Sequence, residues 1–213
     1  MIFKNIRFPD EDNIGLLMEN VFFKFKTQLL QHISEESLIH LEKLWTSKDR
    51  YYHNINHLEK IISNIQFQLV FKELPLVEKH TLLLAAFFHD AVYDPKKNDN
   101  EDQSIKFFKQ SYIGKDGMMV EKVCDLIKVT KFRKRPNKKL ERLFWNADNA
   151  DFKKGFDQLM KNEKLIQKEY KYIPKEKFRE ARIKFIESNI GLFNSKVDRD
   201  LFKLIEYNKN KLK

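Results

Sequence analysis

Apolar residues recur at steps of three and four positions along most of this sequence, and no strand-length stretch alternates convincingly between apolar and polar residues. Only 5 glycines and 5 prolines interrupt the pattern in 213 residues. We therefore expect an all-α fold, in which residues 1–213 form a single domain of eight to ten helices, with no sheet beyond a short pair. An early stripe shows the spacing: Ile14, Leu17, Met18, Val21, Phe22, Phe25 and Leu29.

One segment is apolar on nearly all sides. It begins after Pro75 and reads "LVEKHTLLLAAFFHDAV". Proline suits the first turn of a helix, and an all-round apolar helix is a buried one. The sequence predicts a central helix from about Pro75 to Val92 as the most buried element. His89 and Asp90 lie near its end, where a buried charge needs a partner or a metal ion.

Further histidines and carboxylates lie near other predicted helix ends. His53 and His57, in "YYHNINH", are four residues apart and share a helical face. "FWNADNADF" adds Asp148 and Asp151 at the end of another amphipathic stretch. Alone, each has an ordinary explanation, such as surface polarity or a helix cap. Together they form a donor set that suits Zn, Mn, Fe or Ni better than Ca, and that leaves open positions for water.

Four segments carry a resemblance to a known family: "RYYHNINHLEKI" (50–61), "FFHDAVYDPKKNDNEDQS" (87–104), "NAD" (146–148) and "EYKYIPKEKFREAR" (169–182). The chain resembles the HD-domain superfamily over roughly residues 14–205, and most of all a subgroup of predicted metal-dependent HD phosphohydrolases. "YHNINH" is also similar to the HNxxH signature of cyclic-nucleotide phosphodiesterases. The resemblance implies hydrolysis of a phosphate ester or nucleotide by attack of a metal-bound hydroxide.

The resemblance also implies roles for individual residues. The metal ligands would be His57, His89, Asp90 and Asp148, holding one divalent ion, either Mn, Zn, Fe, Ni or Mg. His53 would protonate the leaving oxygen, and Asp148 would also position or deprotonate the attacking water. No other cofactor is implied.

Three further residues have two readings each. Glu101 either orients a ligand or bound water, or simply begins a helix. Arg50 either binds substrate phosphate or is an ordinary surface arginine. Lys131 opens the basic stretch "KFRKRPNKKLER" (131–142), which either draws in an anionic substrate or is a solvated loop. The segment after Thr130 lacks the histidine that often occurs there in the subgroup, so we expect one tightly held metal ion.

The charge and cysteine content leave other function classes open. Lys and Arg number 41 against 31 Asp and Glu, a net charge of +10. A basic helical protein that binds nucleic acid is one alternative, although acids and bases alternate along most predicted helices. A non-catalytic HD module that senses a nucleotide is the other. Cys124 is the single cysteine, which excludes an internal disulfide, and no apolar run is long enough to span a bilayer. We expect a cytoplasmic protein whose partner is a small phosphorylated substrate, with no membrane partner.

Overall fold

The computed structural model describes residues 20–131 and 134–212, and within these ranges the regular elements are helices. The extended pairing described there is one isolated bridge between Ile33 and Tyr112. The predicted all-α fold is confirmed. None of the described helices combines the length and hydropathy that a bilayer crossing needs.

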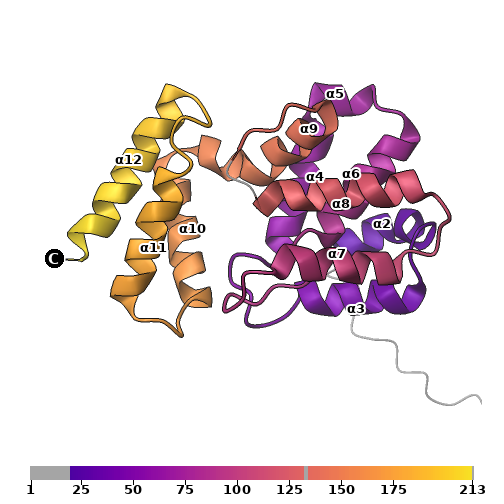
Figure 1. Cartoon of the computed structure of the whole chain (residues 1–213), viewed down its shortest axis with the longest axis horizontal. Helices are drawn as coiled ribbons and strands as arrows, with labels where there is room; N and C mark the ends of the chain where they lie inside the picture. The colour runs from indigo at the N-terminus through magenta and orange to yellow at the C-terminus, as the bar shows by residue number, and fades with distance from the viewer. Residues whose placement is uncertain (1–19, 132–133, 213) are drawn as a thin grey trace, which may run out of the picture.

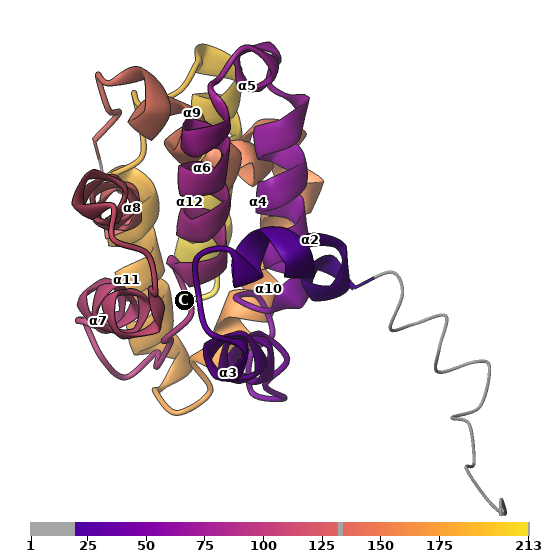
Figure 2. The same ribbon diagram turned by 90° about the vertical axis from the view of Figure 1, so that its right-hand side faces the viewer.

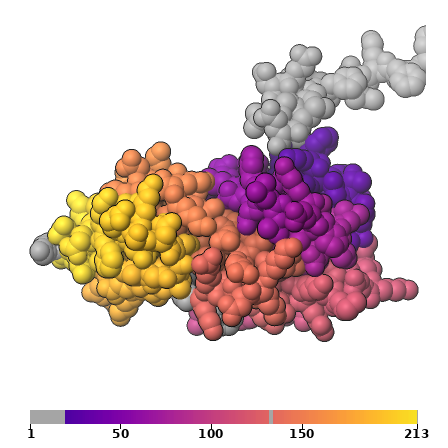
Figure 3. Space-filling model, turned by 90° about the horizontal axis from the view of Figure 1, so that it is seen from above, coloured from indigo at the N-terminus to yellow at the C-terminus, as the bar shows by residue number. Residues whose placement is uncertain are grey.

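The helices fall into two groups that lie side by side along the molecule's long axis (Figure 1, Figure 3). The N-terminal group comprises α2 (Val21–Leu30), α3 (Glu35–Trp45), α4 (Ile55–Phe67), α5 (Leu69–Lys72), α6 (Leu76–Phe88), α7 (Asn100–Ser111), α8 (Gly117–Lys131) and α9 (Lys139–Asp148). The short 3-10 helix η1 (Asn149–Lys154) leads to the C-terminal group, which comprises α10 (Phe156–Glu169), α11 (Lys175–Glu187) and α12 (Ser195–Asn210).

Helix α6 is the centre of the N-terminal group. It lies between α8 and α4 (Figure 2) and contacts α9 as well. Seven of its 13 residues are buried, more than in any other described helix. Phe87 and Phe88 are fully buried, and the ring of Phe87 meets that of Phe22 edge-on at 4.9 Å. The predicted burial of this helix follows from its lack of a polar face.

The predicted end of the central helix at Val92 is wrong, because α6 ends at Phe88. Side chains from elsewhere take up the backbone groups beyond it. Arg50 donates to the carbonyls of Asp90 and Ala91, at 2.7 Å each. The Ser104 hydroxyl bonds to both the amide and the carbonyl of Val92, at 3.1 and 3.2 Å. These contacts replace another helical turn and leave Asp90 on a tight loop.

The C-terminal group has a core of its own. Its buried apolar side chains are Leu159, Ile186, Val197, Leu201, Leu204 and Ile205. A stack of aromatic rings connects it to the N-terminal group. Phe193 stacks on Trp145 of α9 at 5.1 Å and on Phe152 of η1 at 5.2 Å.

Candidate metal centre

The ends of three helices in the N-terminal group bring the candidate ligands together. His57 is in the first turn of α4. Asn54 caps the N-terminal end of this helix by accepting a hydrogen bond from the amide of Asn56. His89 caps the C-terminal end of α6 and Asp90 follows it. Helices α4, α6 and α9 contact one another pairwise, so side chains at their ends can share one point.

The distances between these side chains suit a shared metal ion. His89 Nε2 lies 3.2 Å from Asp90 Oδ2, and His57 Nε2 lies 3.9 Å from the same oxygen. Asp148, the last residue of α9, places Oδ1 3.6 Å from His57 Nε2. Two atoms that are each about 2.0–2.2 Å from one ion lie at most about 4.4 Å apart. One donor atom from each of His57, His89 and Asp90 lies within 4.8 Å of the other two, slightly beyond that limit for an ion-bound set. The predicted ligand Asp148 is not part of this group of three and lies beside it through its contact with His57.

The ring of His89 fits a ligand best. Its Nδ1 lies 2.9 Å from the carbonyl of Ala86, which can only accept, so Nδ1 carries hydrogen. Nε2 then faces the site. It is buried and lies 3.2 Å from Asp90 Oδ2. Metal-bound histidines commonly donate their other nitrogen to a carbonyl in this way, which fixes the ring and its tautomer.

The electrostatics of the cluster favour a cation. Burial by itself would lower the pKa of His89, but the charges of Asp90 and Asp148 outweigh it and raise that pKa to about 9. Burial opposes ionisation of Asp90, yet His89 holds the pKa of this carboxyl well below its usual range. Burial is the main reason that the pKa of His57 is lowered. The low pKa of Asp90 and the lowered pKa of His57 both favour the forms that bind a metal ion.

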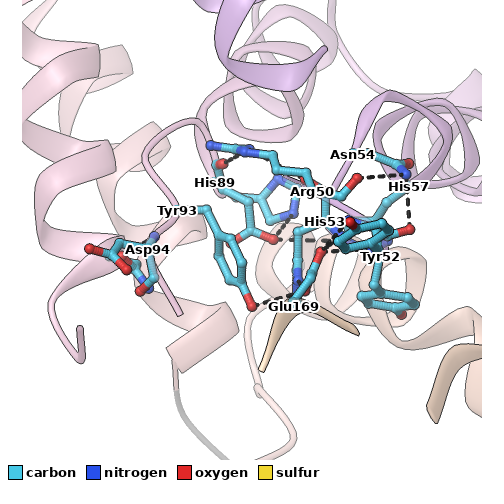
Figure 4. Close-up of polar contacts among 12 residues, drawn as sticks. Arg50, Tyr52, His53, Asn54, His57, His89, Tyr93, Asp94 and Glu169 are labelled. Atoms are coloured by element: carbon cyan, nitrogen blue, oxygen red, sulfur yellow. Dashed lines mark hydrogen bonds and ion pairs between the residues drawn. The ribbon is translucent and has the colours of Figure 1, made fainter. Parts of the chain in front are cut away.

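Arg50 is a buried residue that holds the backbone next to the candidate ligand Asp90. It is 8% exposed, and its guanidinium is occupied by the carbonyls of Asp90 and Ala91. The rings of Trp45 and Tyr93 flank it, with centroids at 5.5 and 5.7 Å. Arg50 therefore fixes the loop that carries Asp90, and both predicted roles, a surface arginine and a phosphate ligand, are less suited to a guanidinium occupied in this way. Figure 4 shows it next to His53 and His89.

His53 lies beside the cluster, and one of its two ring nitrogens is hydrogen-bonded. Its Nδ1 is 2.8 Å from Glu169 Oε2, and its ring stacks on Tyr93 at 4.1 Å. The ring centroid is 5.7 Å from that of His57 (Figure 4). The side chain is 21% exposed, and Nε2 makes no hydrogen bond with a described residue. His53 is thus oriented with one nitrogen left for a ligand or solvent.

Other predicted residues lie apart from this cluster. Lys131 pairs with Asp102 at 2.9 Å, between α8 and α7. Glu101, in the first turn of α7, is partly buried and makes no hydrogen bond with a described residue. Neither forms an ion pair with the candidate ligands. Asp151 pairs with Lys154 at 2.7 Å and accepts from Asn162, in a separate group of contacts. Within the basic stretch, residues 132–133 lie outside the described residues.

A hollow of about 550 Å³ opens beside His57. Ligand pockets commonly range from about 300 to 1,000 Å³. Tyr52, in its wall, has its ring centroid 5.0 Å from that of His57. Its lining also includes Tyr51, Asn54, Asn56, Glu59, Lys60, Ser63 and Leu165.

Two residues at the site were missed from the sequence. Glu169 lies within the segment 169–182, which the family resemblance includes, but a glutamate at the end of an amphipathic helix gives no sign that it reaches a distant loop. Tyr93 follows the His-Asp pair, and its hydroxyl lies 3.1 Å from Glu169 Oε2. Glu169 is identified only by its contacts between the two helical groups, and Tyr93 by its contacts with Glu169 and with the His53 ring.

No protein-family model matches this chain, and no curated protein matches its sequence significantly. The site is therefore interpreted from its own chemistry.

Proposed function

We propose that this protein is a metal-dependent phosphohydrolase of the HD type, acting on a small phosphate ester or nucleotide. The observation that supports it best is the convergence of His57, His89 and Asp90, whose donor atoms lie within 4.8 Å of one another. A buried imidazole and carboxylate brought together in this way suit a transition ion.

His57, His89, Asp90 and Asp148 would hold one divalent ion, with Mn, Zn, Fe, Ni and Mg as the candidates. When bound, the ion acidifies water and neutralises charge on phosphoryl oxygens. The chain's own residues supply the remaining functions. Asp148 is 19% exposed and places an oxygen towards His57, so it can accept a proton from the attacking water.

His53 is proposed as the acid that protonates the departing oxygen. With Nδ1 directed to Glu169, Nε2 is the nitrogen left to donate. Its Nδ1 is engaged by Glu169 and its ring centroid lies 5.7 Å from that of His57, so it need not compete for the ion. A positioned acid of this kind contributes about 10²–10⁴-fold to a rate.

The substrate would enter the hollow beside His57. Tyr52 offers it an aromatic surface and Asn56 an exposed amide. Both suit a small phosphorylated molecule such as a nucleotide. The same proposal places the protein in the cytoplasm. Cys124 is free and buried, which agrees with a reducing compartment.

The basic surface gives less support to nucleic-acid binding. Lys131 pairs with Asp102 and Lys138 with Glu141, each at 2.9 Å, so part of the positive charge is compensated locally. A nucleic-acid-binding protein would bind with a steep salt dependence that survives chelation of metal. A nucleotide sensor would bind its ligand without turnover.

A hydrolysis screen tests the proposal. The protein is stripped with a chelator, reloaded with Mn²⁺, Mg²⁺, Zn²⁺, Ni²⁺ or Co²⁺, and assayed against phosphorylated metabolites and nitrophenyl phosphate. We expect turnover with at least one ion, lost on chelation and absent in His89→Ala. The reference variant Lys128→Ala, at a surface position of α8, should keep full activity. Binding without hydrolysis of any substrate would identify the sensor instead.

A further inference from the structure

Glu169 is a buried carboxylate whose hydrogen bonds all reach into the other helical group. It ends α10, and its side chain is 0% exposed. Oε1 accepts from the amides of Tyr51, Tyr52 and His53 at 2.9, 2.7 and 2.9 Å. Oε2 lies 2.8 Å from His53 Nδ1 and accepts from the Tyr93 hydroxyl at 3.1 Å (Figure 4). One carboxylate thus interacts with five polar groups of the N-terminal group.

Three consecutive amides that converge on one oxygen form an anion-binding concavity in the backbone. Burial alone would raise the pKa of Glu169, but the bonds from His53 and from the backbone amides lower it. The carboxylate is therefore a charged acceptor, which makes these bonds stronger than neutral ones. The segment 51–53 is held in a single path directly before α4, whose first turn carries His57.

Side chains next to Glu169 in the segment 168–172, where α10 ends, contact the same part of the N-terminal group. Tyr172 donates to the carbonyl of Pro95. Lys171 lies 3.9 Å from Asp49, and the Lys168 ammonium lies 5.7 Å from the centroid of the Tyr51 ring. Residues 168–172 therefore contact two segments, 49–53 and 93–95, that flank the candidate site.

We propose that Glu169 is a positioning residue through which the C-terminal group completes the site: it fixes the 51–53 segment and aims Nε2 of His53 at the substrate. The effect on the reaction rests on the proposed function, whereas the effect on the segment does not. The candidate metal ligands are all in the N-terminal group, so Glu169 should affect the acid and leave metal binding nearly unchanged.

Glu163 provides a matched control on the same helix. As whole residues the two are equally buried, at 4% exposed for Glu163 and 5% for Glu169, but the partners of Glu163 are Arg182 and Asn208 within the C-terminal group. Glu163→Ala removes a buried carboxylate from α10 without touching the 51–53 segment. Glu169→Gln keeps an oxygen for the three amides but replaces the carboxylate beside His53.

The experiment measures amide hydrogen exchange, Mn²⁺ affinity by calorimetry, and kcat and KM in the full chain. In Glu169→Ala we expect exchange at residues 51–53 at least about tenfold faster. The kcat should fall about 10–100-fold with little change in KM. Mn²⁺ affinity should change less than about threefold, well below the loss caused by removing a ligand. Glu169→Gln should restore slow exchange and part of kcat, and Glu163→Ala should leave exchange at 51–53 and kcat as in the parent.

Unchanged exchange at 51–53 in Glu169→Ala, or equal acceleration in Glu163→Ala, would overturn the proposal. Full kcat in Glu169→Ala would overturn it too, even if the hydrolase proposal stands. If the parent hydrolyses nothing, the exchange and Mn²⁺ measurements still decide whether Glu169 fixes the segment. If Glu169→Ala does not fold, the same measurements are made on Glu169→Asp. This variant withdraws the carboxylate by one methylene.

Discussion

Glu163 in the C-terminal group is a buried carboxylate and Asp90 in the N-terminal group a partly buried one, and their surroundings differ. Glu163 receives three hydrogen bonds from the Arg182 guanidinium at 2.9–3.2 Å. Asp90 instead faces the rings of His57 and His89, and Nε2 of His89 makes no hydrogen bond with a described residue. A buried charge whose hydrogen bonds are satisfied by one fixed partner is typical of a structural pair, whereas several converging donor atoms with perturbed pKa values are typical of a site that binds a ligand.

The largest expected effect comes from Asp90→Ala. Removing a residue proposed to bind the metal directly should lower metal affinity more than about 100-fold. That is more than the loss typical of removing a residue that only hydrogen-bonds to a ligand. The helices should persist, because the core of the N-terminal group does not depend on this side chain. Metal analysis after gel filtration and far-ultraviolet circular dichroism measure the two. Stoichiometric metal in the variant would contradict the proposed site.

His53→Ala should lower turnover by about 10²–10⁴-fold and leave metal content nearly intact. The loss should be smaller for nitrophenyl phosphate, whose leaving group needs little protonation. Steady-state kinetics on substrates with good and poor leaving groups provide the measurement. Equal losses for both would remove His53 from the acid role, and loss of metal would make it a ligand.

Arg182→Ala should act on stability alone. It leaves Glu163 buried without its main partner, which costs about 3 kcal/mol in the free energy of unfolding. Replacing both residues with leucine should recover most of that loss, because two buried charges then disappear together. Denaturant unfolding measures stability, and metal affinity serves as the control. A change in metal affinity would show that the two clusters are coupled.

The smallest expected effect concerns pH. In the metal-free protein the pKa of His89 is raised to about 9 by Asp90 and Asp148, against the effect of burial. Its contribution to stability is full below the unfolded value of about 6.5 and is lost as pH rises through 9. Metal must displace that proton, so affinity should rise about tenfold per pH unit between those values. Calorimetry in buffers of different ionisation enthalpy counts the released proton. Affinity that does not change over this range would contradict a charged His89.

The same comparison separates what local sequence predicts from what it does not. The apolar spacing predicted the helices, and the all-round apolar character of 76–88 predicted the burial of α6. The end of that helix could not be predicted, because Arg50 and Ser104 determine it from other parts of the chain.

Residue types marked several imidazoles and carboxylates near predicted helix ends, and the family resemblance selected His57, His89, Asp90 and Asp148 among them. Their geometry required the pairwise packing of α4, α6 and α9, which brings the helix ends to one point. The partner of His53 lies 116 residues further along the chain, in the C-terminal group. Periodicity reports which face of a helix is buried, but it carries no information about which distant side chain will meet that face. The sequence by itself therefore determined the helical fold and the chemistry available to it, and tertiary packing alone decided that Glu169 would hold His53 beside the candidate metal centre.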